Sequence, residues 1–154
     1  MNIEVKSFEP QISAAIKKTS ISMGDFPGVL DDMSAKLMKH LSDNGKTMAG
    51  APYIAYMNMS EDYSQFDIEW GFPVAEPVSE TDEIYMSHTF GGKAITAIHK
   101  GKYNEVGRIY DAVMEYQKEN SLEGTGIWYD YYLNDPDTVA ESELLTQVLF
   151  PIKE

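Results

Sequence analysis

The chain has 154 residues, of which 43% are hydrophobic and 24% are charged, and it contains no cysteine. These values are ordinary for a soluble globular domain, and the lack of cysteine excludes disulfides, thiolate metal ligands and a cysteine nucleophile. The formal net charge of −13 disfavours direct binding to nucleic acid, because such binding relies on lysine and arginine contacts with phosphates.

Neither a membrane span nor a targeting segment is predicted. No apolar run approaches the roughly 20 residues that a helix needs to cross a bilayer. The first residues, Met1–Val5, lack the basic and apolar segments of a secretory signal peptide. We therefore expect a cytoplasmic protein that has no membrane partner.

The first half of the chain is predicted to form two strands, one helix and two more strands. The helix is indicated by apolar residues three and four positions apart, including Leu30, Met33 and Leu37. The strands are indicated by β-branched and aromatic residues between turn residues. The expected strands are 2–8, 11–18, 52–58 and 65–72, and the expected helix is 27–43.

The segment Thr19–Phe26 has no counterpart in the second half, and we expect it to form a loop at the edge of a ligand cleft. Asp25 precedes the predicted helix as a candidate N-cap, because its carboxylate can accept hydrogen bonds from the free N–H groups of the first turn. Pro27 suits that first turn, where the N–H that proline lacks would have no partner inside the helix.

The second half repeats the same order of elements. Val106, Ile109 and Val113 form the apolar stripe of its helix. The expected strands are 84–90, 94–100, 127–133 and 144–151, and the expected helix is 104–119.

The two halves also match residue by residue, which indicates an internal duplication. Tyr56-Met57-Asn58 corresponds to Tyr132-Leu133-Asn134, 76 positions later. We therefore predict a single α+β domain of two β-β-α-β-β modules, residues 1–74 and 84–154, joined by a linker of residues 75–83. The expected architecture is an antiparallel eight-stranded sheet with two helices flanking a central pocket.

Asp130 is the strongest candidate for a functional residue. It lies between aromatic residues in a predicted strand, although aspartate is among the poorest strand formers. Strand alternation places Trp128 and Tyr132 on its face. Because a buried carboxylate needs a cation or hydrogen-bond donors, Asp130 is either a ligand-binding group or a carboxylate satisfied by water or a tyrosine hydroxyl. Its counterpart in the first half is Ile54, so the fold of the module does not require the acid.

Glu69 is a second acidic residue in the middle of a predicted strand. Its counterpart, Gln147, is also polar, which indicates that this position faces water or a ligand cleft in both halves. A solvated strand face is an equally good interpretation.

No metal or cofactor is predicted. The histidines His40, His88 and His99 lack the spacing of a metal site. No phosphate-binding loop with its partner residues and no serine-nucleophile motif is present either.

Several segments resemble the GyrI-like small-molecule-binding domain, an effector module of multidrug-sensing transcription activators that also occurs as free-standing proteins. The resemblance covers nearly the whole chain and implies a duplicated β-β-α-β-β fold with an antiparallel sheet, two helices and a central pocket. The segments that carry it best are His99-Lys100-Gly101-Lys102-Tyr103, Trp128–Pro136 and Leu149-Phe150-Pro151-Ile152.

The resemblance also implies a site. Drug-sensing members of the family bind lipophilic cations through a buried glutamate ringed by aromatic side chains, and Asp130 takes the position of that glutamate. Aspartate keeps the carboxylate but shortens its reach by one methylene, so we expect the ligand size or the depth of cation binding to differ. Some free-standing relatives hydrolyse cyclopropane-bearing genotoxins, and others modulate DNA gyrase through protein contacts.

The leading hypothesis is a free-standing binding protein for lipophilic, cationic aromatic compounds. Asp130 supplies the charge, Trp128 and Tyr132 form the walls, Tyr56 comes from the first half, and Glu69 is a further candidate ligand contact. A hydrolase in which Asp130 or Glu69 activates water is the first alternative. A protein-interaction module such as a gyrase inhibitor is the second. The protein is expected to be a monomer or a homodimer.

Overall fold

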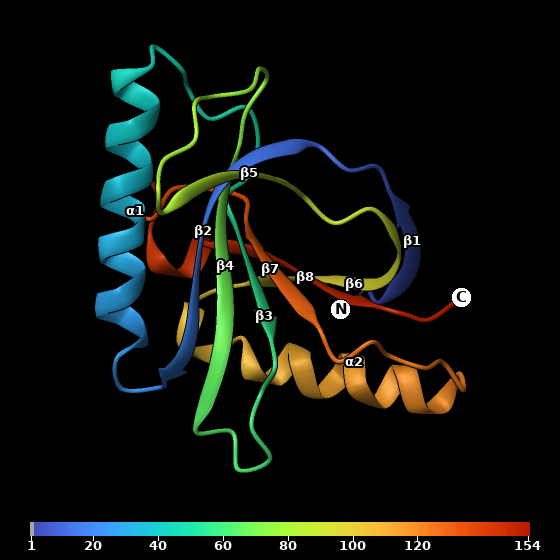
Figure 1. Cartoon of the computed structure of the whole chain (residues 1–154). Coiled ribbons are helices and arrows are strands. Elements are labelled where there is room, and N and C mark those ends of the chain that lie inside the picture. The colour runs from blue at the N-terminus through green and yellow to red at the C-terminus, as the bar shows by residue number, and fades with distance from the viewer. Residues whose placement is uncertain (1) are drawn as a thin grey trace. The chain divides into compact units, whose positions relative to one another are not determined.

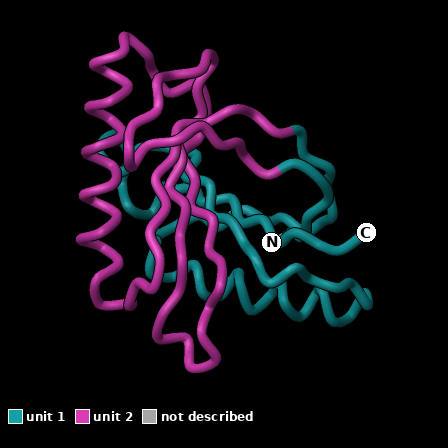
Figure 2. The backbone as a smooth tube through the Cα atoms, in the orientation of Figure 1, with its two compact units in different colours: residues 1–9, 91–154 teal, residues 10–90 magenta. Residues whose placement is uncertain are grey.

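The computed structural model describes residues 2–154, and these residues form two compact units. Unit 2 consists of residues Pro10–Phe90, and unit 1 combines the residues up to Glu9 with Gly91–Glu154. Figure 2 shows the two segments of unit 1 in one colour, with the N-terminal segment running beside the C-terminal half of the chain.

Unit 2 is an antiparallel four-stranded sheet with one helix. The strand order is β3-β4-β2-β5. The helix α1 lies along β2 and β4, and Met33, Leu37 and Leu41 are its buried residues (Figure 1). The elements in chain order are β2 (Ile12–Ser22), α1 (Phe26–Asp43), β3 (Tyr53–Met57), β4 (Gln65–Pro73) and β5 (Ile84–His88).

Unit 1 likewise consists of four antiparallel strands and one long helix. The strand order is β1-β6-β8-β7. Two short 3-10 turns, η1 (Tyr103–Glu105) and η2 (Glu141–Glu143), precede α2 and β8. The other elements are β1 (Glu4–Phe8), β6 (Gly92–Lys100), α2 (Gly107–Glu119), β7 (Trp128–Tyr132) and β8 (Leu145–Pro151).

The α+β class, the eight antiparallel strands and the two helices are therefore confirmed. The pairing of the strands adds a feature that the order of elements did not indicate. The first strand of each half pairs with a strand from the other half, because β1 pairs with β6 and β5 pairs with β2. The repeat boundaries at 74 and 84, and the pocket between the halves, remain predictions.

The segment Thr19–Phe26 was expected to be a loop, and this is wrong for residues 19–22, which belong to β2. Strand β2 continues to Ser22, with an irregular register between Lys18 and Ile21 and a φ of 53° at Ser20. The strand resumes because Ile21 is buried opposite Phe66 on β4. A bulge of this kind adds a residue without ending a strand.

The N-terminus of α1 also differs from the expectation. Asp25 occupies the N-cap position, and Pro27 lies in the first turn as predicted. The side chain of Asp25, however, makes no capping hydrogen bond. Its backbone N–H instead donates to the hydroxyl and the carbonyl of Ser22.

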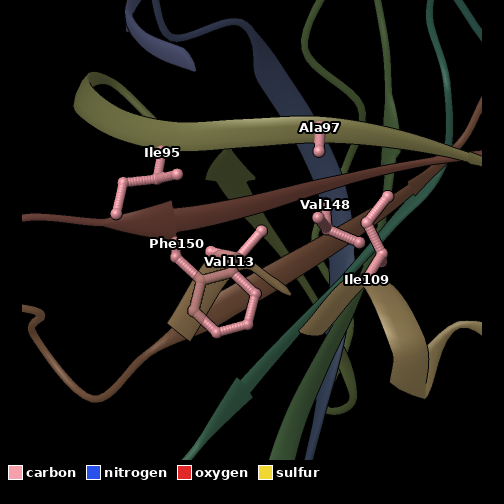
Figure 3. Packing of buried hydrophobic residues seen from close by; sticks show 6 residues of the cluster. All are labelled: Ile95, Ala97, Ile109, Val113, Val148 and Phe150. Atoms are coloured by element: carbon pink, nitrogen blue, oxygen red, sulfur yellow. The ribbon is translucent and has the colours of Figure 1, made fainter. Parts of the chain in front are cut away.

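The core of unit 1 forms where α2 packs on β6 and β8. Figure 3 shows Ile109 and Val113 of α2 lying against Val148 and the other apolar side chains of the strands. Burying such side chains stabilises the folded state by about 1.5–3 kcal/mol each. The cluster consists of Ile95, Ala97, Ile109, Val113, Val148 and Phe150.

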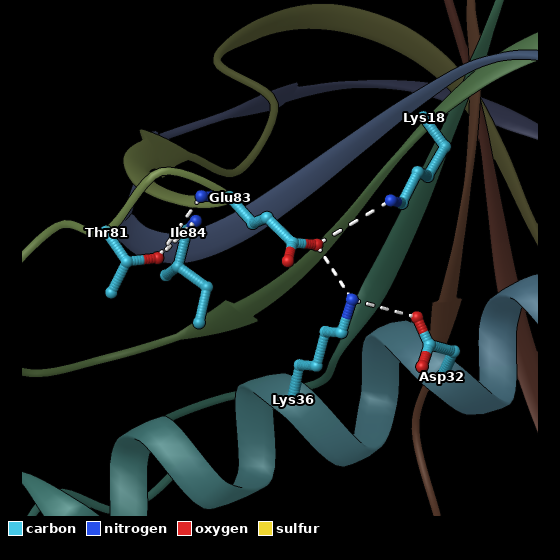
Figure 4. A network of polar contacts seen from close by, with 6 residues as sticks. All are labelled: Lys18, Asp32, Lys36, Thr81, Glu83 and Ile84. Atoms are coloured by element: carbon cyan, nitrogen blue, oxygen red, sulfur yellow. Dashed lines mark hydrogen bonds and ion pairs between the residues drawn. The ribbon is translucent and has the colours of Figure 1, made fainter.

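The segment before β5 is held to α1 by exposed ion pairs (Figure 4). The Lys36 ammonium lies 2.8 Å from Glu83 and 3.1 Å from Asp32, and Lys18 lies 3.6 Å from Glu83. The Thr81 hydroxyl also accepts hydrogen bonds from the backbone of residues 83 and 84.

No helix within residues 2–154 has both the length and the apolar character needed to cross a membrane.

Candidate ligand-binding site

Asp130 is a buried carboxylate on the helix-facing side of the unit 1 sheet. It lies in β7 opposite Val148 of β8, which is part of the core against α2. These surroundings leave Asp130 only 3% exposed. Trp128 and Tyr132 share this face by alternation along the strand, and both are half-buried.

The Tyr110 hydroxyl of α2 donates a short hydrogen bond to Asp130 Oδ2. Burial, and then the negative charge of Asp130, raise the pKa of Tyr110 far above its usual range. The phenol therefore stays protonated and acts as a fixed donor. This bond from α2 orients the carboxylate of Asp130.

Tyr110 was missing from the predicted site, although the repeat contains a signal for it. The residue 76 positions earlier is Ser34, and the counterpart of Asp130 is Ile54. The second half thus gains a phenol and a carboxylate together. That coupled change could have identified Tyr110 as the partner of Asp130.

Aromatic rings surround this pair. The rings of Trp128 and Phe150 stack at 6.1 Å and 14°. The ring of Tyr110 contacts both of them edge-on, at 6.3 Å from Trp128 and 5.8 Å from Phe150. Tyr132 packs edge-on at 5.1 Å against Tyr103 of η1. Asp130 therefore lies between two strand residues, Trp128 and Tyr132, that belong to two groups of packed rings. The sequence had indicated Trp128 and Tyr132.

Tyr56, the predicted contact from the first half, belongs to an aromatic cluster of unit 2. Its ring lies 5.9 Å from Phe26, at the start of α1, and 5.9 Å from Phe66 of β4. Phe26 and Phe66 are 5.5 Å apart. Tyr56 belongs to unit 2. Its contact with a ligand bound at Asp130 stays a prediction.

Glu69 is half-buried on the other face of the unit 2 sheet, the face that points away from α1. Its carboxylate accepts hydrogen bonds from Tyr53 at 2.9 Å, Tyr85 at 2.6 Å and Ser87 at 3.1 Å to each oxygen. Burial is the main cause that raises the pKa of both tyrosines well above the usual range. Glu69 is therefore well supplied with donors from the protein itself.

The absence of a side chain at Gly71 makes this arrangement possible. A Cβ at this position would lie 2.4 Å from two atoms of the Tyr53 ring and 2.5 Å from its hydroxyl oxygen. The Tyr53 ring can therefore lie close against Gly71 of β4. It presents the hydroxyl to Ser13 at 2.8 Å as well as to Glu69.

An open hollow of about 430 Å³ lies in unit 2 between the end of β2 and the start of α1. Lys18, Ile21, Asp25 and Val29 are among its lining residues, and none of the predicted ligand residues is. In the described part of the chain, no three His, Cys, Asp or Glu residues are placed to hold a metal ion.

A family model supplies the first comparison with known proteins. The model described as the GyrI-like small molecule binding domain matches residues 1–153. A comparison with curated proteins finds no match.

Solved structures share the fold at low sequence identity. The EcmrR C-terminal domain has a TM-score of 0.84 and 18% identity, covering 99% of this chain and 98% of that one. SAV2435, solved with tetraphenylphosphonium, has a TM-score of 0.67 and 10% identity over 99% and 94%. A hydrolase from Listeria innocua has a TM-score of 0.63 and 12% identity over 98% and 91%. The chain spans 57% of the EcmrR chain in a DNA complex.

Proposed function

The chain belongs to the GyrI-like family of small-molecule-binding domains, and on that premise we propose that it binds lipophilic aromatic cations at Asp130. The observation that carries the proposal is a carboxylate that is 3% exposed among aromatic rings. A buried carboxylate attracts a cation, and the faces of aromatic rings do the same. Both features select for positive charge and apolar bulk in one ligand.

The magnitudes are sufficient for useful affinity. Contacts between a cation and an aromatic face contribute about 0.5–2 kcal/mol each. Together with a charge-assisted contact to Asp130 and the burial of ligand rings, they make micromolar binding, about −8 kcal/mol, attainable. Trp128 and Tyr132 would supply the walls, and Tyr56 is a candidate for a further contact.

The choice of cation follows from the same chemistry. The neighbour SAV2435 was solved with tetraphenylphosphonium, a lipophilic cation, which makes this compound a suitable probe here. Triphenylphosphine oxide has similar rings and no net charge. We expect calorimetry to give micromolar binding of tetraphenylphosphonium and at least about tenfold weaker binding of the oxide. Equal affinities would show that charge does not select the ligand.

The hydrolase alternative finds less support at Glu69. A general base must accept a proton from water, and the oxygens of Glu69 already accept hydrogen bonds from Tyr53, Tyr85 and Ser87. Asp130 is the better candidate if the protein turns over a substrate. Hydrolysis of a strained electrophile by the parent and not by an Asp130→Asn variant would favour that alternative.

A further inference from the structure

Thr146 on β8 presents a hydroxyl that the protein does not satisfy. The residue is 1% exposed, and its Oγ has no hydrogen-bond partner among residues 2–154. Other buried hydroxyls are bonded: Ser13 pairs with Tyr53 at 2.8 Å, and Thr96 donates to the Val148 carbonyl at 2.9 Å. Because buried polar groups are almost always hydrogen-bonded, an exception indicates a missing partner.

This hydroxyl belongs to the same sheet face as Asp130. Thr146 lies directly opposite Tyr132 on β7, and Asp130 lies opposite Val148, two residues further along β8. Directly opposite residues of an antiparallel pair share a face, and diagonal neighbours are about 7–8 Å apart at their Cα atoms. On the other side of Thr146 lies His99 of β6. The Nε2–H of His99 donates to the Lys102 carbonyl at 2.9 Å.

We propose that Asp130 and Thr146 together bind a protonated primary amine carried on an aromatic framework. The inference rests on the proposed function and narrows its ligand class. One N–H of the ammonium would donate to Asp130, whose Oδ2 is oriented by Tyr110. A second N–H would donate to the Thr146 hydroxyl. Hydrogen bonds of about 2.7–2.9 Å from one nitrogen can reach side-chain oxygens on diagonal neighbours of two strands.

Aspartate and threonine favour this ligand over a quaternary cation. A quaternary nitrogen has no N–H and is shielded by carbon, so it leaves Thr146 unsatisfied. A cage made only of aromatic rings favours quaternary ammonium, because a compact primary ammonium is strongly hydrated and costs more to desolvate. The order of affinity between the two cations therefore distinguishes hydrogen bonding from aromatic caging.

The experiment compares 3,3-diphenylpropylamine with its N,N,N-trimethyl derivative by calorimetry at neutral pH. Both carry one positive charge and the same rings. We expect the parent to bind the primary amine at least about tenfold more tightly. Equal affinities, or a preference for the trimethyl compound, would overturn the inference and leave the proposed function standing. Failure of the parent to bind either cation would overturn both.

Variants assign the preference to the hydroxyl. Thr146→Val should reduce the preference to about threefold or less, while Thr146→Ser, which retains the hydroxyl, should preserve it. Thr96→Val is the matched control, because Thr96 is also buried but its hydroxyl donates to Val148. An undiminished preference in Thr146→Val would overturn the role of Thr146.

A stability measurement provides an independent check on the same residue. Thr146→Val should keep or raise the thermal midpoint of the unliganded protein, because it removes a buried hydroxyl that has no partner. Thr96→Val should lower the midpoint, because it removes a hydrogen bond that is made. A midpoint that falls in Thr146→Val as it does in Thr96→Val would show that the hydroxyl already has a partner, and would overturn the inference.

Discussion

The Tyr110 hydroxyl fixes the carboxylate of Asp130 from the neighbouring helix. Tyr110→Phe keeps the ring contacts with Trp128 and Phe150 and removes the hydroxyl that donates to Asp130. Loss of a hydrogen bond to a buried charged group costs about 1–3 kcal/mol, and we expect the free energy of unfolding to fall by that amount in urea denaturation.

A second tyrosine on the same helix supplies the control for this prediction. The Tyr116 ring packs at the edge of the unit 1 core, and Tyr116→Phe should change the free energy of unfolding by less than about 0.5 kcal/mol. Similar losses in both variants would show that the Tyr110 hydroxyl stabilises nothing through Asp130.

At the scale of elements, the packing of β3 on β4 depends on Gly71. A methyl group there would overlap the Tyr53 ring, so Gly71→Ala should destabilise the protein by about 1–3 kcal/mol. A methyl group at Gly28 of α1 would meet no neighbouring atom within 4 Å, and Gly28→Ala should stabilise the helix by up to about 1 kcal/mol. Chemical denaturation of both variants tests these two predictions. An unchanged free energy of unfolding in Gly71→Ala would contradict the packing of Tyr53 against Gly71.

The elements themselves could be predicted because their signals are local. The apolar spacing of the helices and the aromatic and β-branched runs of the strands gave the correct order, and the class followed. The continuation of β2 past Lys18 was missed, because the bulge depends on Ile21 packing opposite Phe66. The pairing of β1 with β6 was missed because nothing in a strand's own residues specifies a distant partner.

In the candidate site too, the residue with a local signal could be predicted, and the residues that depend on distant packing could not. Asp130 could be found because an aspartate between aromatic residues conflicts with its strand. Comparing the two halves offered a signal for Tyr110, but periodicity alone could not place the hydroxyl groups of Tyr110 and Thr146 beside Asp130. Their positions depend on how α2 and β8 pack on β7.

For the whole molecule, the buried Tyr53 and the half-buried Tyr110 lead us to expect a loss of stability at alkaline pH. Burial, followed by the charges of Glu69 and Asp130, raises the pKa of Tyr53 and Tyr110 above the usual value of about 10. Below about pH 10 both states keep these protons; above it, the unfolded state loses protons that the folded state retains. The free energy of unfolding should therefore fall by about 1.4 kcal/mol per pH unit for each tyrosine.

Urea denaturation between about pH 9 and 11, on both sides of the usual tyrosine pKa, would measure how the free energy of unfolding changes with pH. Tyr53→Phe should make the slope shallower, whereas substitution of the exposed Tyr63 (71% exposed) by Phe should leave it unchanged. A slope that does not respond to Tyr53→Phe would contradict the assignment.

The central claim, that Asp130 selects a cationic ligand, is tested most directly by titrating tetraphenylphosphonium into the parent and Asp130→Asn in a calorimeter. The substitution keeps volume and removes charge, and it should weaken binding at least about tenfold, or 1.4 kcal/mol. Triphenylphosphine oxide should be affected by less than about twofold, and Glu69→Gln should bind the cation as the parent does. Undiminished binding by Asp130→Asn, or a loss confined to Glu69→Gln, would contradict the account.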